Sequence, residues 1–92
     1  MDISILIVSW NVRELLLRCL TALPAAVEDE LTFETIVVDN GSSDGTVEAI
    51  RDEHPQVRVI ANRENRGFTG GNNQALAEAQ GISLFLLNPD TE

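Results

Sequence analysis

Apolar residues fall into four short continuous runs, separated by segments with helical spacing. The runs occupy residues 3–9, 34–38, 57–61 and 83–87. Apolar runs of this length, without polar alternation, are typical of β-strands that are buried on both faces of a parallel sheet. The pattern therefore predicts four parallel strands.

The segment between the first two runs predicts an amphipathic helix. Asn11 and Glu14 have the spacing of a capping box at its start, and Pro24 is expected to stop it. The apolar face of this helix would be formed by Leu15, Leu16, Cys19, Leu20 and Leu23.

Two further helices are expected between the later strands. Ser43 or Asp44 can cap the second helix. A third helix is expected after Gly70–Asn73, with Gly81 as its C-terminal cap. Its inward positions would be Ala75, Leu76 and Ala79.

The resulting order β-α-β-α-β-α-β predicts one α/β domain over residues 1–92. Its parallel sheet would be covered by helices on both faces, with right-handed crossovers. Folds of this class bind ligands beyond the carboxyl ends of their strands. Residues directly after each strand are therefore the first candidates for a binding site.

The composition narrows the class of ligand. The formal net charge of −9 argues against a broad surface for nucleic acid or anionic membranes, which needs clustered Lys and Arg. It leaves open a small anionic ligand held together with a metal ion. The single cysteine, Cys19, excludes an internal disulfide. The apolar run at residues 3–8 is too short to span a bilayer, and Asp2 stands where a signal peptide carries basic residues.

Polar residues follow every expected strand, whereas the loops at the opposite ends, around 25–33 and 54–56, are plainer. This asymmetry favours a polar ligand over turn chemistry alone. The residues that follow the strands are Ser9, Trp10, Asn11, Asp39, Asn40, Asn62, Arg63, Asn88 and Asp90.

Several positions allow two interpretations. Asp39 can accept hydrogen bonds from a base or a ribose, or can cap the following turn. The glycine-rich segment 67–71 can approach a phosphate or pack tightly as a helix begins, and it matches neither a Walker A loop nor the G-x-G-x-x-G fingerprint. Trp10 can wall a pocket or cover the sheet edge. Asp90 suits a hard cation such as Mg²⁺ or Mn²⁺, or is a turn aspartate. His54 alone supplies neither a Ser-His-Asp triad nor a zinc cluster.

Together these residues resemble a known family. The motifs are ISILIVSWN at 3–11, IVVDNGSSDGT at 36–46, NRGFTGGNN at 65–73 and LLNPDTE at 86–92. In this order they resemble the N-terminal half of family 2 inverting glycosyltransferases, in particular the rhamnosyltransferase-like branch. The resemblance implies the A-type glycosyltransferase fold, whose nucleotide-binding αβα layer would have strand order 3-2-1-4 in this portion.

The resemblance also implies which residues bind the nucleotide. Ser9 and Trp10 would line its pocket. Asp39 would bind the base, and Asp44 would help to hold the same loop. The nucleoside and diphosphate would be bordered by Asn65, Arg66, Gly67, Gly70, Gly71 and Asn72.

By the same resemblance, Asn88 and Asp90 occupy the positions of an Asp-x-Asp motif, in which Asn88 departs from the acidic residue that many relatives carry and leaves one fewer carboxylate. Asp90 would bind Mg²⁺ or Mn²⁺, and Asn88 would lie near the ribose. The metal would neutralise charge on the leaving diphosphate while an acceptor hydroxyl attacks with inversion. The general base would lie beyond Glu92, so no catalytic residue is expected in this segment, which would be inactive alone.

The donor would be a dTDP-, UDP- or GDP-sugar, with rhamnose suggested by the branch. The acceptor would be a growing glycan or a lipid-linked glycan, which places the whole enzyme in the cytoplasm near the inner face of the membrane. We expect Glu92 to end a fragment that holds the donor half and lacks the acceptor half. Residues 84–87 would then form a bare apolar edge, through which two copies are expected to associate.

Two other functions stay open on the sequence. One is a non-catalytic nucleotide-binding or regulatory module of the same fold. The other is a sugar nucleotidyltransferase-like domain, which would carry a glycine-rich loop with Arg and Lys directly after the first strand. This chain has Trp10-Asn11 at that position, which counts against the second alternative.

Overall fold

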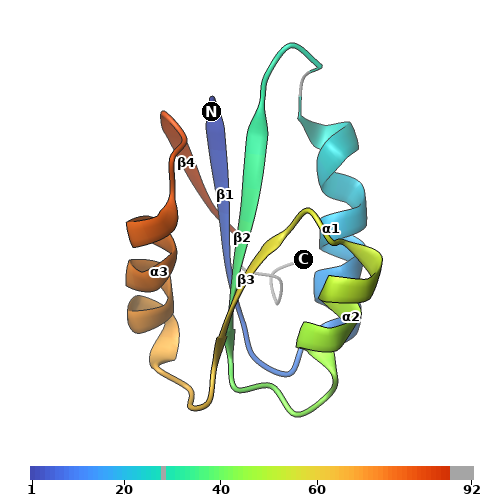
Figure 1. Cartoon of the computed structure of the whole chain (residues 1–92), viewed down its shortest axis with the longest axis vertical. Coiled ribbons are helices and arrows are strands. Elements are labelled where there is room, and N and C mark those ends of the chain that lie inside the picture. The colour runs from blue at the N-terminus through green and yellow to red at the C-terminus, as the bar shows by residue number, and fades with distance from the viewer. Residues whose placement is uncertain (28, 88–92) are drawn as a thin grey trace.

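The computed structural model describes residues 1–27 and 29–87. Its elements are β1 (Ile3–Ser9), α1 (Arg13–Ala26), β2 (Phe33–Asn40), α2 (Thr46–Glu53), β3 (Arg58–Asn62), α3 (Gly67–Glu78) and β4 (Ser83–Leu87). The four strands form one parallel sheet in the order β3-β2-β1-β4, which confirms the expected topology. Helix α3 covers one face of the sheet, and α1 and α2 cover the other (Figure 1).

The core consists of two apolar clusters, one on each face of the sheet. On the side of α1 and α2 the fully buried residues include Ile7, Leu16 and Ile50. On the side of α3 they include Leu6 and Ile36. Strands β1 and β2 lie between the clusters and contribute to both, which is why their sequences are apolar at nearly every position.

The start of α1 differs from the expected capping box. The helix begins at Arg13 after Val12, whose own side chain makes no capping hydrogen bond. Asn11 has a left-handed backbone with φ of 52°, and its side chain accepts a hydrogen bond from the N–H of Ser43 instead. Pro24 lies inside the last turn of the helix, which continues to Ala26. The side chain of Asn11 therefore bonds to the loop after β2 instead of capping α1.

Helix α3 begins earlier than expected, so the glycine-rich segment forms its first turns rather than a preceding loop. Ala75 is buried as predicted, whereas Leu76 is exposed. The helix ends at Glu78, and Gly81 is not a left-handed cap. Gly81 instead passes so close to β1 that a Cβ atom there would collide with the backbone of Ser4.

Strand β4 lies at the end of the sheet. The side chains of Leu84, Phe85 and Leu86 are 47%, 53% and 53% exposed, in contrast to the buried apolar residues of β1 and β2. Among the described residues, only β1 pairs with β4. Within this part of the chain, no helix has both the length and the apolar character needed to cross a membrane.

Candidate nucleotide-binding edge

The loops that leave β1, β2 and β3 lie together at one edge of the sheet, at the lower end of Figure 1. The register places Ser9 opposite Asp39, and Asn40 opposite Asn62. Polar side chains that are far apart in the sequence are thus neighbours here. This is the edge at which a ligand was expected.

Asp39 is a buried carboxylate whose oxygens are occupied by hydrogen bonds. It is 2% exposed. The N–H of Ser42 donates to Oδ2 at 2.9 Å, and the hydroxyls of Ser42 and Ser9 donate to Oδ1 at 2.5 and 3.2 Å. A buried carboxylate needs such partners, since unpaired burial of a charge is costly. The geometry realises the turn-capping interpretation of Asp39, and it also joins the ends of β1 and β2.

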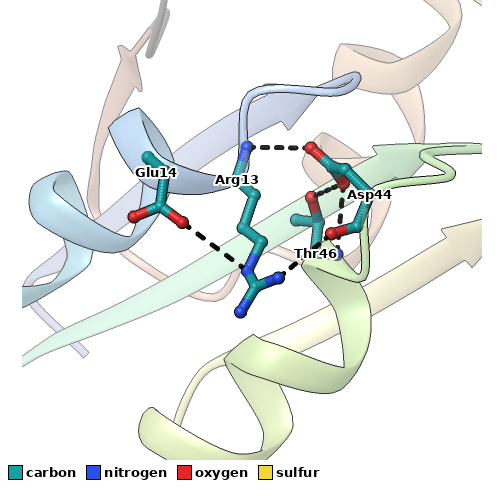
Figure 2. A network of polar contacts seen from close by, with 4 residues as sticks. All are labelled: Arg13, Glu14, Asp44 and Thr46. Carbon is teal, nitrogen blue, oxygen red and sulfur yellow. Dashed lines mark hydrogen bonds and ion pairs between the residues drawn. The ribbon is translucent and has the colours of Figure 1, made fainter.

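Further hydrogen bonds join the loop after β1 to the loop after β2. The N–H of Asn11 donates to Oγ of Ser42, and the N–H of Ser43 donates to Oδ1 of Asn11, each at 2.8 Å. The N–H of Arg13 donates to Oδ2 of Asp44 at 3.1 Å, and the Arg13 guanidinium reaches the Asp44 carbonyl at 3.3 Å (Figure 2). These contacts fix the position of one loop relative to the other.

Asp44 also serves the start of α2. Its Oδ1 accepts hydrogen bonds from the N–H and the hydroxyl of Thr46, across Gly45, whose φ of 80° makes the turn (Figure 2). Partial burial, the largest single influence, raises the pKa of Asp44, but the hydrogen bonds from Thr46 and Arg13 together outweigh it and lower the pKa below its ordinary value. The charged form of Asp44 therefore holds the loop in place.

The first turn of α3 brings the expected glycine-rich segment to the same edge. Oδ1 of Asn65 accepts a hydrogen bond from the N–H of Gly67 at 2.7 Å, and Gly67 has a φ of 76°. Gly71 packs against β1, where a Cβ atom would lie 2.8 and 2.9 Å from the methyl groups of Val8. At Gly71 the geometry is that of tight helix packing. A Cβ atom on Gly70 would lie 3.1 Å from Cβ of Arg66, a less severe contact.

A chain of three side-chain amides at this edge was not predicted from the sequence. It consists of Asn40, Asn62 and Gln74, and it connects β2, β3 and α3. The sequence carried a partial signal, because Asn40 and Asn62 end neighbouring strands. Gln74 follows Gly67 by seven residues, which puts both on one side of a helix.

Exposed side chains surround these buried contacts. Trp10 is 54% exposed and Phe68 is 55% exposed. Arg63 and Arg66 line a polar hollow of about 360 Å³ beyond the end of β3, together with Glu64. Asn72, which was also predicted to border the ligand, is buried in α3. None of these placements by itself assigns a ligand.

The metal site cannot be built from the described residues. Nowhere in residues 1–27 and 29–87 do three His, Cys, Asp or Glu side chains gather as a metal site would need. The carboxylates of Asp39 and Asp44, which follow β2, already accept hydrogen bonds from the protein. The predicted metal ligand Asp90 and its neighbour Asn88 lie outside the described residues.

Comparison with known proteins identifies relatives over nearly the whole chain. The profile described as "Glycosyl transferase family 2" matches residues 4–92. The uncharacterised glycosyltransferase YfnE of Bacillus subtilis (strain 168) is 39% identical over 92 residues, which are 98% of this chain and 23% of that protein. The succinoglycan biosynthesis protein ExoO of Rhizobium meliloti (strain 1021) is 33% identical over 97% of this chain and 25% of that protein.

A solved structure shares the fold. The mannosyltransferase PcManGT from Pyrobaculum calidifontis, in complex with GDP-Man and Mn²⁺, matches with a TM-score of 0.83 at 26% identity, over 97% of this chain and 27% of that one. The expected A-type fold is thereby confirmed for this portion. The chain spans about a quarter of the length of each of these three relatives.

Proposed function

The chain belongs to glycosyl transferase family 2, and on that premise we propose that it binds the nucleoside diphosphate of a sugar donor at the carboxyl edge of its sheet. The observation that carries the proposal is the convergence of Ser9, Asp39 and the first turn of α3 at that edge. The relation to a mannosyltransferase solved with GDP-Man supports it. We assign residues 1–92 to the donor half of a longer transferase.

The nucleoside would lie between the joined loops and α3. The exposed ring of Trp10 offers a flat apolar face, and bases stack on such faces. Ser9 and Asp39 would lie beneath the base. Ser42, which donates two hydrogen bonds to Asp39, could give up one of them and bond to the ligand instead. Oδ2 of Asp39 accepts one hydrogen bond in the structure and has a lone pair left for a donor from the base.

The diphosphate would lie along the start of α3. The predicted contacts there are Asn65, Arg66, Gly67, Gly70 and Asn72. Backbone N–H groups and the positive end of a helix favour a negative charge at this position. The exposed residue Arg66, directly before the helix, would add a positive charge. This local attraction would have to exceed the repulsion from a chain with a net charge of −9.

The finer assignment follows the resemblance. We propose a deoxythymidine-, uridine- or guanosine-diphosphate donor, with rhamnose as the sugar, and a glycan or lipid-linked acceptor. Asn88 would lie near the ribose, and Asp90 would bind Mg²⁺ or Mn²⁺, which would supply charge neutralisation at the leaving diphosphate. The general base would come from outside residues 1–92. A whole enzyme of this kind would work in the cytoplasm, at the inner face of the membrane.

Isothermal titration calorimetry tests the proposal. Uridine, thymidine and guanosine diphosphates would be titrated separately, each with and without Mg²⁺, into the chain and into an Asp90→Ala variant. We expect one nucleotide to bind with a Kd that Mg²⁺ lowers in the chain and does not lower in the variant. Equal weak heats for all three, unchanged by Mg²⁺, would contradict the proposal.

A further inference from the structure

Asn40 uses its buried side chain to hold the start of α3 from both sides. The residue is 2% exposed. Its Nδ2 donates to the carbonyl of Gly67 at 3.1 Å, and its Oδ1 accepts from the N–H of Arg66 at 3.3 Å. The two bonded groups belong to the peptides that flank Arg66 and Gly67. One side chain therefore fixes the peptide before Arg66 and the peptide after Gly67, on either side of the turn in which Gly67 has a positive φ.

Two further amides fix Asn40 in turn. Nδ2 of Asn62 donates both to Oδ1 of Asn40, at 3.0 Å, and to Oε1 of Gln74, at 2.7 Å. Nε2 of Gln74 returns a hydrogen bond to Oδ1 of Asn62 at 2.9 Å. Rotation of any one amide by 180° would place like groups against each other, because a carbonyl oxygen only accepts and an NH₂ group only donates. The three amides therefore have one mutually compatible orientation.

The network lies next to the loops joined by Asp39, on the other face of the sheet. Consecutive residues of a strand point to opposite faces. Asp39 binds Ser42 and Ser9 on the side of α1 and α2, and Asn40 binds Arg66 and Gly67 on the side of α3. Two adjacent residues at the end of β2 thus position the loop that follows β2 and the start of α3.

We propose that Asn40, Asn62 and Gln74 are positioning residues that hold the first turn of α3 in the conformation that receives the nucleoside diphosphate. The nature of the ligand rests on the proposed function, whereas the ordering of the turn does not. Preorganisation of this kind raises affinity, because the cost of ordering the loop has already been met in the free protein.

The Asn40→Asp variant tests the proposal through its pH dependence. The ionised carboxylate still accepts hydrogen bonds, but it cannot donate to the Gly67 carbonyl and instead repels it. Below the pKa of the introduced carboxyl, an O–H group restores the donor. We therefore expect ¹⁵N order parameters for residues 65–70 near 0.6 at neutral pH, against about 0.85 in the unaltered chain, with recovery as the pH falls. A purely structural loss would not recover on protonation.

Asn73→Asp is the matched control, because it adds the same charge on α3 one residue before Gln74, at an exposed position. It should leave the order parameters of residues 65–70 unchanged.

Gln74→Glu is the second test variant. Because Gln74 is only partly buried, this variant is expected to fold even where Asn40→Asp does not. It removes the donor to Asn62 and should loosen the same turn to a smaller degree.

Nucleotide affinity gives a second readout. The Kd of the tightest-binding of uridine, thymidine and guanosine diphosphates would be compared between variant and unaltered chain at each pH. We expect a ratio of about ten at neutral pH that returns towards one in acid, the size expected for one lost hydrogen bond. If the unaltered chain binds none of the three, the proposed function fails, and the order parameters alone decide on the positioning role. Order parameters for residues 65–70 that match the unaltered chain in both test variants would overturn it.

Discussion

Asp39 and Asn40 show how much of the edge depends on single residues. Both were expected at the end of the second strand, and both are buried with every oxygen or nitrogen of the side chain bonded. The sequence predicted their position because the apolar run before them marks the strand. It could not predict their partners, since Ser9 and Gly67 reach them only through strand order and helix docking.

Asp44 makes a prediction about acid stability. Because its pKa is lowered in the folded chain, the charged form contributes stability that is fully present above the unfolded pKa of about 4 and is lost as the pH falls through the folded pKa. The Asp44→Asn variant should be less stable than the unaltered chain at pH 7. The difference between the two should shrink as the pH falls below the unfolded pKa and through the lowered pKa of the folded chain.

Urea unfolding at several pH values would measure this difference in the free energy of unfolding. Glu48→Gln, an exposed change in the first turn of α2, is the control for the general effect of removing one negative charge. A difference for Asp44→Asn that stays constant from pH 7 to pH 2 would show that the carboxylate does not hold the loop.

At the scale of elements, strands were predicted well and helix ends poorly. The continuous apolar runs of β1 and β2 reflect burial on both faces of the sheet, so the sequence marks these strands directly. Strand β4 was predicted from the same kind of run, although its side chains are largely exposed. The ends of helices depend on which tertiary partner a polar residue finds. Asn11 bonds to Ser43 instead of capping α1, and Gly81 is required by the nearby backbone of Ser4 rather than by a helix end.

The contact between α3 and β1 yields a prediction for Gly71→Ala. Alanine favours a helix over glycine by about 1 kcal/mol. Its Cβ atom would lie within 3 Å of both methyl groups of Val8, and overpacking of a core typically costs about 1–3 kcal/mol. We expect a net loss of stability on urea unfolding. Combination with Val8→Ala should recover part of the loss, and strictly additive effects of the two changes would contradict the packing argument.

At the scale of the whole molecule, β4 is the place where the described fold is open. Its segment 82–87 carries no charged side chain, in a chain with a net charge of −9. Of the described residues, only β1 pairs with β4, and Leu84, Phe85 and Leu86 are about half exposed. Strand edges without charge, proline or a bulge favour pairing. We propose that two copies associate through antiparallel pairing of β4, the orientation that a two-fold axis requires.

Sedimentation equilibrium over a concentration series tests the association. Leu86→Lys should shift the chain to monomer, because it places a charge on the uncovered strand. Leu76→Lys, at an exposed apolar position on α3, should not change the mass distribution. A monomer at all concentrations for the unaltered chain would rule out the pairing.

The sequence predicted the overall architecture because strand order and parallel pairing follow from the alternation of elements and the family motifs. It also placed Ser9, Asp39 and the glycine-rich segment at one edge. It missed the amide network, since nothing local distinguishes Gln74 from any polar helix residue. The expected metal ligand Asp90 remains a prediction, as do the sugar and the acceptor.

Binding of a nucleoside diphosphate at the carboxyl edge of the sheet is the function proposed for this chain. The most direct measurement is a ¹H–¹⁵N chemical-shift map of the chain as the tightest-binding nucleoside diphosphate is added with diamagnetic Mg²⁺. We predict saturable shifts at the amides of Trp10, Ser42 and residues 67–70, and none at the amides of residues 29–31, 56 and 57 at the opposite edge. Shifts confined to the opposite edge, or no saturable shift, would contradict the account.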